Sequence, residues 1–233
     1  MTGQVENWDE IAEWWSGEVS ADPVYREDIG PMLGRLLGTA SGPIVDLGCG
    51  EGQWLRRLPR ELNIIGCDRS ERLLAATVGD HRVVVGELPS ITWLRDTMIG
   101  AAYSVFVLDL IGDMATFFAE TARVVRPAGV LVVIINHPIF TAPDSGPFMD
   151  PDLDVFWRWG GYLERGESPV PAGDRFVTMY HRPLGDVLTA AAGAGWILEE
   201  MIETPLGAAA IEREPSYGGQ EGIPRFLGVR WRR

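Results

Sequence analysis

Basic residues are scarce in this chain, and this limits the partners it can bind. Lysine and arginine together number 20 against 33 acidic residues, which gives a formal charge of −13. A nucleic-acid-binding surface needs basic side chains to neutralise phosphates, so we expect no nucleic-acid partner. Four arginines do gather near the C-terminus, and we interpret them as a solubilising strand end because no aromatic-rich basic stripe accompanies them: Arg225, Arg230, Arg232 and Arg233.

Cysteines and long apolar runs are also few. Cys49 and Cys67 are the only cysteines, and nothing gives them the spacing of metal ligands, so we expect no metal site. A low cysteine content fits a reduced, cytoplasmic setting. The longest apolar runs are about a strand long, and no basic segment followed by an apolar one opens the chain. We therefore expect no membrane partner and no signal peptide. We also expect the protein to be a monomer or a homodimer.

Strands and helices alternate from residue 43 to about 136, within a length of 233 residues that suits one α/β domain. The strands are mainly apolar, and the fifth is apolar throughout, which predicts a parallel sheet covered by helices on both faces. A further helix and two strands are expected near the C-terminus. The seven predicted strands are 44–47, 63–67, 82–85, 101–108, 130–135, 196–203 and 226–231.

Two segments depart from this alternation. Residues 1–30 have apolar residues at roughly helical spacing, among them Trp14, Trp15 and Tyr25, and we interpret them as lid helices. Residues 137–183 are rich in proline and in aromatic residues. Proline predicts a loss of regular structure, and the aromatics predict an ordered segment rather than a linker. We expect this segment to be an insertion that covers the substrate.

The strongest signal is a glycine-rich turn after the first strand, Asp46-Leu47-Gly48-Cys49-Gly50-Glu51-Gly52. Gly48 and Gly50 lack a Cβ, so the backbone can turn sharply and a ligand can approach closely. The spacing is G-x-G-x-G, not the G-x-G-x-x-G of dinucleotide sites. Asp46 would attract a cationic amine, whereas Asp46 and Glu51 would repel a pyrophosphate. A nicotinamide oxidoreductase is therefore disfavoured.

A second acid, Asp68, closes the second strand about twenty residues after this turn, where it can accept the hydroxyls of a ribose. The alternative role, a helix cap, is already filled by Ser70.

These segments, with Glu120-Thr121-Ala122-Arg123-Val124-Val125-Arg126-Pro127-Ala128-Gly129, resemble the class I S-adenosylmethionine-dependent methyltransferase family. The resemblance covers residues 30–136 well and 184–233 in outline. It implies a Rossmann-like sheet of seven mostly parallel strands, with one antiparallel strand near the C-terminal edge. It also implies S-adenosylmethionine as cofactor, its methionine part held by Asp46, Gly48, Cys49 and Gly50, and its ribose by Asp68.

Other cofactor contacts are expected from the same comparison. The family often places an acid after its third strand against the adenine amine. Here Glu87 is the nearest acid but is out of register, and Leu88 could offer a backbone contact instead. The fourth strand begins with Gly100 where the family often has Asp. The remaining expected contacts are Trp15, Tyr25, Arg69 and Ser104.

The acceptor site is less defined. Transfer to oxygen or carbon would need a base. His137 is the first candidate because it follows the fifth strand, and the resemblance supports a His-Pro pair there; His181 is the second. Asp109 could contact either ligand or lie on the surface, and His81 is expected on the surface.

The aromatic residues of the insertion could line an acceptor pocket or pack the insertion on the sheet. We expect a methyltransferase acting on a small, apolar or aromatic metabolite of secondary metabolism. The alternatives are a non-methylating reaction on the same fold, such as cyclisation, and a non-catalytic ligand-binding protein.

Overall fold

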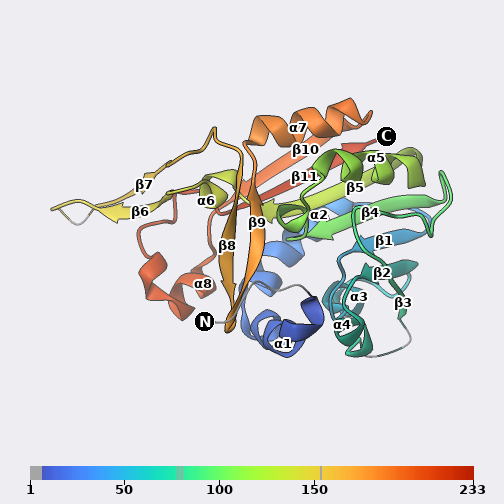
Figure 1. Cartoon of the computed structure of the whole chain (residues 1–233), viewed down its shortest axis with the longest axis horizontal. Helices are drawn as coiled ribbons and strands as arrows, with labels where there is room; N and C mark the ends of the chain where they lie inside the picture. The colour runs from blue at the N-terminus through green and yellow to red at the C-terminus, as the bar shows by residue number, and fades with distance from the viewer. Residues whose placement is uncertain (1–6, 78, 80, 153) are drawn as a thin grey trace.

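A seven-stranded sheet forms the centre of the computed structural model, which describes residues 7–77, 79, 81–152 and 154–233 (Figure 1). The strand order is β10-β11-β5-β4-β1-β2-β3. β11 is antiparallel to both of its neighbours, and the pairs from β5 to β3 are parallel. The expected fold class is therefore confirmed. The strands are β1 (Ile44–Leu47), β2 (Ile64–Asp68), β3 (Arg82–Val85), β4 (Ile99–Val105), β5 (Val125–Asn136), β10 (Ile197–Thr204) and β11 (Phe226–Arg232).

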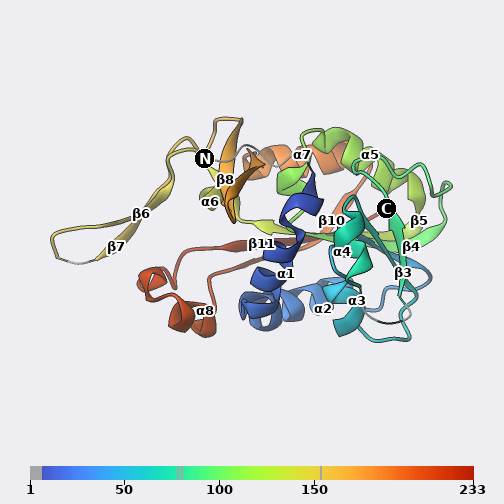
Figure 2. The same cartoon turned by 60° about the horizontal axis from the view of Figure 1, so that its bottom comes forward.

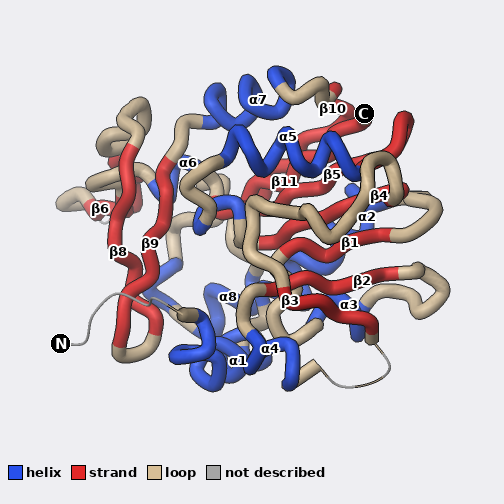
Figure 3. Tube along the Cα trace, turned by 45° about the vertical axis from the view of Figure 1, so that its right-hand side comes forward, coloured by secondary structure: helices blue, strands red, loops and turns tan. Residues whose placement is uncertain are grey.

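Helices cover both faces of this sheet, and each face has its own core. α5 (Met114–Val124) and α7 (Leu184–Gly193) lie over one face, and α2 (Gly30–Leu37) and α3 (Gln53–Arg57) lie over the other (Figure 3). Side chains of a strand alternate between faces. In β5, Leu131 and Val133 join the α5 core, while Val130 and Val132 join the α2 core. This alternation explains why the strand is apolar throughout.

The first described segment is held beside the helix that follows β2. It contains η1 (Trp8–Ile11), α1 (Ala12–Ala21) and η2 (Tyr25–Ile29), and it leads into α2. Asp9 accepts hydrogen bonds from the Ser70 hydroxyl at 2.6 Å and the Arg72 amide at 3.0 Å. Ser70 also caps α4 (Glu71–Ala75). These bonds hold the start of the chain beside α4. Residues 1–6 of the predicted lid lie outside the described residues.

The prediction that residues 137–183 lose regular structure is wrong. They form α6 (Pro138–Thr141) and two antiparallel hairpins, β6 (Gly146–Met149) with β7 (Val155–Arg158), and β8 (Gly166–Ala172) with β9 (Arg175–His181). A strand that pairs on one side only tolerates proline, which explains Pro169 and Pro171 in β8. The β6–β7 hairpin projects away from the body, whereas the β8–β9 hairpin stands beside the sheet (Figures 1 and 2).

The connection from β10 to β11 adds α8 (Ala208–Arg213) and η4 (Pro215–Tyr217), two elements that the sequence did not predict. A short turn, η3 (Leu108–Leu110), follows β4. Within the described ranges, no helix has the length and apolar content needed to cross a bilayer.

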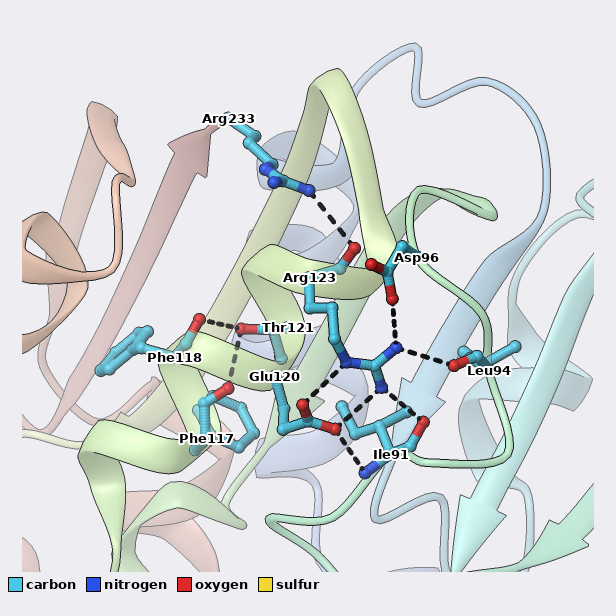
Figure 4. A network of polar contacts seen from close by, with 9 residues as sticks. All are labelled: Ile91, Leu94, Asp96, Phe117, Phe118, Glu120, Thr121, Arg123 and Arg233. Carbon is cyan, nitrogen blue, oxygen red and sulfur yellow. Dashed lines mark hydrogen bonds and ion pairs between the residues drawn. The ribbon is translucent and has the colours of Figure 1, made fainter.

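The Glu120–Arg123 stretch has a structural role that bears on the site (Figure 4). The Arg123 guanidinium donates to both carboxylate oxygens of Glu120, at 2.8 and 2.9 Å, and to the carbonyls of Ile91 and Leu94. Glu120 in turn accepts the Ile91 amide at 3.2 Å. α5 is thereby tied to the segment between β3 and β4. That segment begins with Gly86 and ends at Met98, and its first residues line the site described next.

Candidate active site

A cavity of about 670 Å³ opens at the carboxyl ends of β1, β2 and β4. This is the edge at which open α/β sheets bind ligands. We call it the donor cavity. Its lining residues come from the N-terminal segment, the glycine turn, the end of β2, the β3–β4 segment and the residues after β4: Trp8, Trp15, Gly48, Gly50, Asp68, Arg69, Leu73, Gly86, Leu88, Val105, Phe106, Val107, Leu110 and Ile111.

The turn after β1 can only be built with glycine at Gly48. Its φ is +81°, and a Cβ there would lie 2.3 Å from the Cγ2 of Val107. The amides of Gly48 and Cys49 both donate to the Cys67 carbonyl, at 2.8 and 2.9 Å. The turn is thus fixed to β2 on one side and closed by Val107 on the other. Its backbone forms one wall of the donor cavity.

Asp68 connects this turn to the next helix. Its Oδ2 accepts the Gly50 amide at 2.8 Å, and its Oδ1 accepts the Ser70 amide at 2.9 Å. Burial raises the pKa of this carboxyl, and the two amide bonds act in the opposite direction. The carboxylate is therefore held in one orientation at the cavity wall. Each oxygen has a further lone pair, so the group fits a ligand that presents two neighbouring hydroxyls.

Asp46 is the least satisfied polar group near the site. It is 1% exposed, and neither carboxylate oxygen has a hydrogen bond of good geometry within the described chain. Burial raises its pKa to about 8, while the nearby Tyr103 hydroxyl acts to lower it. A buried acid of this kind is stabilised by a neighbouring positive charge. The observation agrees with a cationic amine bound over the glycine turn.

The structure places most of the predicted cofactor residues together. Trp15, Gly48, Gly50, Asp68, Arg69 and Leu88 line the donor cavity. Tyr25 and Cys49 border a smaller space that adjoins it. Three others do not line it: Asp46 and Ser104 are buried in the strands, and Glu87 lies outside, where its Oε1 is 3.4 Å from an Arg69 nitrogen.

Half of the lining residues that sequence reasoning missed follow β4, and the others are Trp8, Leu73, Gly86 and Val105. Phe106, Val107, Leu110 and Ile111 all line the donor cavity. The sequence carried one usable signal, because the segment after the fourth strand of a parallel sheet must meet the same edge as the glycine turn. The strand prediction ran to residue 108, past the true end at Val105, and this hid the turn.

A second and larger space of about 1300 Å³ adjoins the first, and we call it the acceptor cavity. The two cavities share Trp8, Trp15, Phe106 and Leu110. Its walls come from α1, the β8–β9 hairpin, α8 and the start of β11. The other lining residues are Trp14, Glu18, Asp22, Val24, Tyr25, Asn136, Val170, Pro171, Ala172, Val177, Met179, Leu206, Ala210, Arg213, Glu214, Tyr217, Arg225 and Phe226.

Phe106 lies at the junction of the two cavities. Its φ is +57°, which is unusual for a residue other than glycine. The ring packs edge-on against Tyr25, with 5.8 Å between centroids, and in a tilted arrangement against Phe226, with 5.7 Å between centroids. Strained backbone of this kind persists where the surroundings fix it, often at functional sites. Here it directs an aromatic ring to the boundary between the cavities.

The two candidate histidines lie elsewhere. His137 caps α6, since its Nδ1 accepts the Ile139 amide at 3.2 Å, and its Nε2 is 2.8 Å from Glu203. His181 is 2% exposed, with Nδ1 2.8 Å from the Thr141 hydroxyl and Nε2 2.9 Å from the Tyr162 carbonyl. Neither lines the donor or the acceptor cavity. Each ring is held by bonds at both nitrogens, so this geometry gives no support to a histidine base.

Asp109 and the aromatic residues of the insertion were expected as possible ligand contacts, and the structure places them elsewhere. Asp109 is buried and accepts the amide and the side-chain Nδ2 of Asn136, at 3.2 and 3.4 Å. Burial raises its pKa to about 6. Trp157 packs on Phe140 and donates to the Ile139 carbonyl, and Trp159 is exposed. The part of the insertion that reaches the acceptor cavity is the β8–β9 hairpin, through Val170, Val177 and Met179 among others.

Comparisons with known proteins agree with this site. The sequence model of a family described as "Methyltransferase domain" matches residues 45–133. An uncharacterised methyltransferase of Emericella nidulans is 29% identical over 215 residues, which cover 82% of this chain and 66% of that protein. The chain thus spans about two thirds of that relative's length.

Solved structures show the same fold. An S-adenosylmethionine-dependent methyltransferase of Mesorhizobium loti is 29% identical, with a TM-score of 0.76 over 87% of this chain and 96% of the other. A protein of Listeria monocytogenes, described as a putative methyltransferase of the same type, has a TM-score of 0.74 at 18% identity, over 89% of this chain and 99% of the other.

Proposed function

The chain belongs to the class I S-adenosylmethionine-dependent methyltransferase family, with S-adenosylmethionine as its cofactor, and from this premise we propose that it methylates a small molecule held in the acceptor cavity. The observation that carries the proposal is the junction of the two cavities at Trp8, Trp15, Phe106 and Leu110. A molecule in the acceptor cavity would meet the donor only through this junction.

The residues of the donor cavity fit the cofactor. Asp68 offers lone pairs for the ribose hydroxyls, the glycine turn leaves room for the methionine part, and the buried Asp46 favours its amine. Leu88 and Gly86 provide an apolar wall and a close backbone approach for the base. When bound, S-adenosylmethionine supplies an activated methyl group on a sulfonium. Trp15 can present an aromatic face to that positive charge.

The protein's main contribution is positioning. Bringing two reactants together in the correct orientation accounts for a large part of the rate of such transfers. Among the described residues that line either cavity there is no histidine. We therefore propose transfer by proximity to an acceptor that needs no histidine base, such as an amine or a group that is already ionised.

The enclosure of the acceptor cavity supports a small molecule rather than a macromolecule, because α1, α8 and the β8–β9 hairpin surround it on several sides. The acidic charge of −13 points the same way. The free, buried Cys49 and Cys67 agree with a reducing, cytoplasmic setting. We also propose that this small molecule is a product of secondary metabolism.

The test is incubation of the protein with methyl-labelled S-adenosylmethionine and a cell extract separated into metabolites, RNA and protein. We expect label in the metabolite fraction, and roughly ten- to a hundred-fold less label with the Asp68→Ala variant when the donor concentration is kept below the wild-type dissociation constant. Label confined to RNA or protein would contradict the small-molecule acceptor. Binding of the donor with no label transferred to any fraction would favour a non-methylating reaction.

A further inference from the structure

Arg225 is placed unlike the other arginines near the C-terminus. Arg230 and Arg232 both pair with Glu199 on the neighbouring strand, at 2.8 and 2.7 Å, and are part of the surface. Arg225 precedes β11 and turns inward to line the acceptor cavity. The interpretation of all four arginines as a solubilising strand end is therefore wrong for Arg225.

The backbone of Arg225 is fixed on both sides. Its amide donates to the Thr204 carbonyl at 2.7 Å, and its carbonyl accepts the His137 amide at 2.8 Å. The guanidinium lies over the Phe140 ring, 4.1 Å from the centroid. Stacking of this kind holds the planar group while leaving its edge free for hydrogen bonds.

Its charge is not neutralised by a direct partner. Arg225 forms no ion pair with any described carboxylate, and its Nε is buried without a hydrogen-bond partner. Burial lowers the pKa of the guanidinium, against the more distant influence of Tyr217 and Asp22. Because the charge of Arg225 is largely buried and has no direct partner, an anion bound in the cavity would stabilise it.

The acids of the same cavity are already engaged. Glu18 and Asp22 lie 3.7 and 3.5 Å from the nitrogens of Arg213. Glu214 accepts the amide and hydroxyl of Ser216. These acids add negative charge to the walls of the same cavity, which disfavours a dianion such as a phosphate. A single carboxylate matches one arginine fork and adds the least repulsion.

We propose that the acceptor carries a carboxylate, and that Arg225 binds it as a specificity-determining residue. This inference rests on the proposed function, because it needs an acceptor in that cavity. Arg225 is not among the four residues shared by the two cavities. The carboxylate would therefore be the anchoring end of the acceptor, and the methylated atom would lie at its other end, near Phe106. The product retains its carboxylate.

The product itself provides the first test. Labelled metabolites made by the wild-type protein from the extract are treated with a carbodiimide and excess methylamine, which converts carboxylates to amides, and are then separated by reversed-phase chromatography. A product that keeps a carboxylate elutes at a new position after this treatment, whether or not it also carries an amine. A labelled product whose elution is unchanged would overturn the proposal. Absence of any labelled product, with S-adenosylhomocysteine still bound, would instead count against the proposed function itself and remove the basis of this inference.

Variants then test the residue. Loss of a hydrogen bond to a charged group corresponds to roughly ten- to a hundred-fold in affinity, so Arg225→Gln should lower formation of the acidic product by about that factor at low extract concentration. Arg225→Lys keeps the positive charge but lacks the planar guanidinium fork. Its product formation should lie between that of the wild type and that of Arg225→Gln. The matched control is Arg232→Gln, which removes an arginine of β11 that pairs with Glu199 on the surface and lines neither cavity.

Folding is monitored independently by S-adenosylhomocysteine affinity, which should stay within a few-fold in all three variants. If Arg225→Gln loses that affinity, product formation by the wild type is compared with that of Arg225→Lys instead, because this variant retains the positive charge. Equal product formation by folded Arg225→Lys, Arg232→Gln and wild type would contradict the role of the guanidinium fork. A loss in Arg232→Gln as large as that in Arg225→Gln would contradict the assignment to Arg225.

Discussion

Gly48→Ala should be strongly destabilising because two separate penalties meet at this position. The new Cβ would lie 2.3 Å from Cγ2 and 3.0 Å from Cγ1 of Val107. Overpacking of this kind costs about 1–3 kcal/mol. The backbone φ of +81° adds about 1–2 kcal/mol for any residue with a side chain. We expect the free energy of unfolding, measured in urea at 25 °C, to fall by roughly 2–5 kcal/mol.

The two penalties can be separated. Gly50→Ala has a similar backbone conformation, with φ +54°, but its Cβ would meet only the Nε1 of Trp15 at 3.7 Å, an ordinary contact. It should therefore cost about 1–2 kcal/mol. Adding Gly48→Ala to a Val107→Ala protein removes the clash and should cost a similar amount. The coupling between the two positions should then be about 1–3 kcal/mol. The reasoning is refuted if Gly48→Ala costs no more than Gly50→Ala, or if the coupling is zero.

Three further predictions concern groups around the site. His137→Gln and His181→Gln should each keep turnover within a few-fold once folding is controlled by urea denaturation, because neither residue lines the donor or the acceptor cavity. A loss of a hundred-fold or more in either variant would restore that histidine as the base. Asp46→Asn should stabilise the ligand-free protein by an amount that grows from about pH 4 to pH 8. The folded pKa of about 8 lies above the unfolded value of 3.8, so the wild type loses stability as pH rises through that range. A stability difference that is flat from pH 4 to 8 would contradict this environment. Arg123→Met should lower the free energy of unfolding by about 1–3 kcal/mol and weaken S-adenosylhomocysteine binding several-fold by calorimetry. The reason is that the segment containing Gly86 and Leu88 loses its hydrogen bonds to α5. Arg126→Met, which changes an exposed side chain, is the control.

The sheet and the glycine turn could be predicted because their signals are local. The central strands consist mostly of apolar residues, and Asp113 and Ser70 cap helices that begin where the sequence indicates. Asp46, Gly48 and Asp68 were identified for the same reason, since strand ends in a parallel sheet meet at one edge. Boundaries were less accurate. β5 begins at Val125, five residues before the predicted start, because Ala128 adopts a left-handed conformation, φ +61°, and the strand continues past it.

The acceptor side could not be predicted because it depends on contacts between distant segments. Arg225 and Phe140 are far apart in sequence, and only the folded chain shows that one lies over the other. The β8–β9 hairpin was hidden by its prolines, and α8 has no strong cap or periodic pattern. His137 followed a strand as expected, but a backbone amide two residues later and a carboxylate on β10 occupy its nitrogens.

The central claim, that Asp68 and the glycine turn hold S-adenosylmethionine, is tested most directly by titration calorimetry with S-adenosylhomocysteine. We predict one binding site on the wild-type protein. Asp68→Ala removes a charged acceptor, which typically costs about 1.5–3 kcal/mol, so affinity should fall roughly ten- to a hundred-fold in a variant that still unfolds cooperatively. Unchanged affinity in folded Asp68→Ala, or no binding by the wild type, would contradict the account.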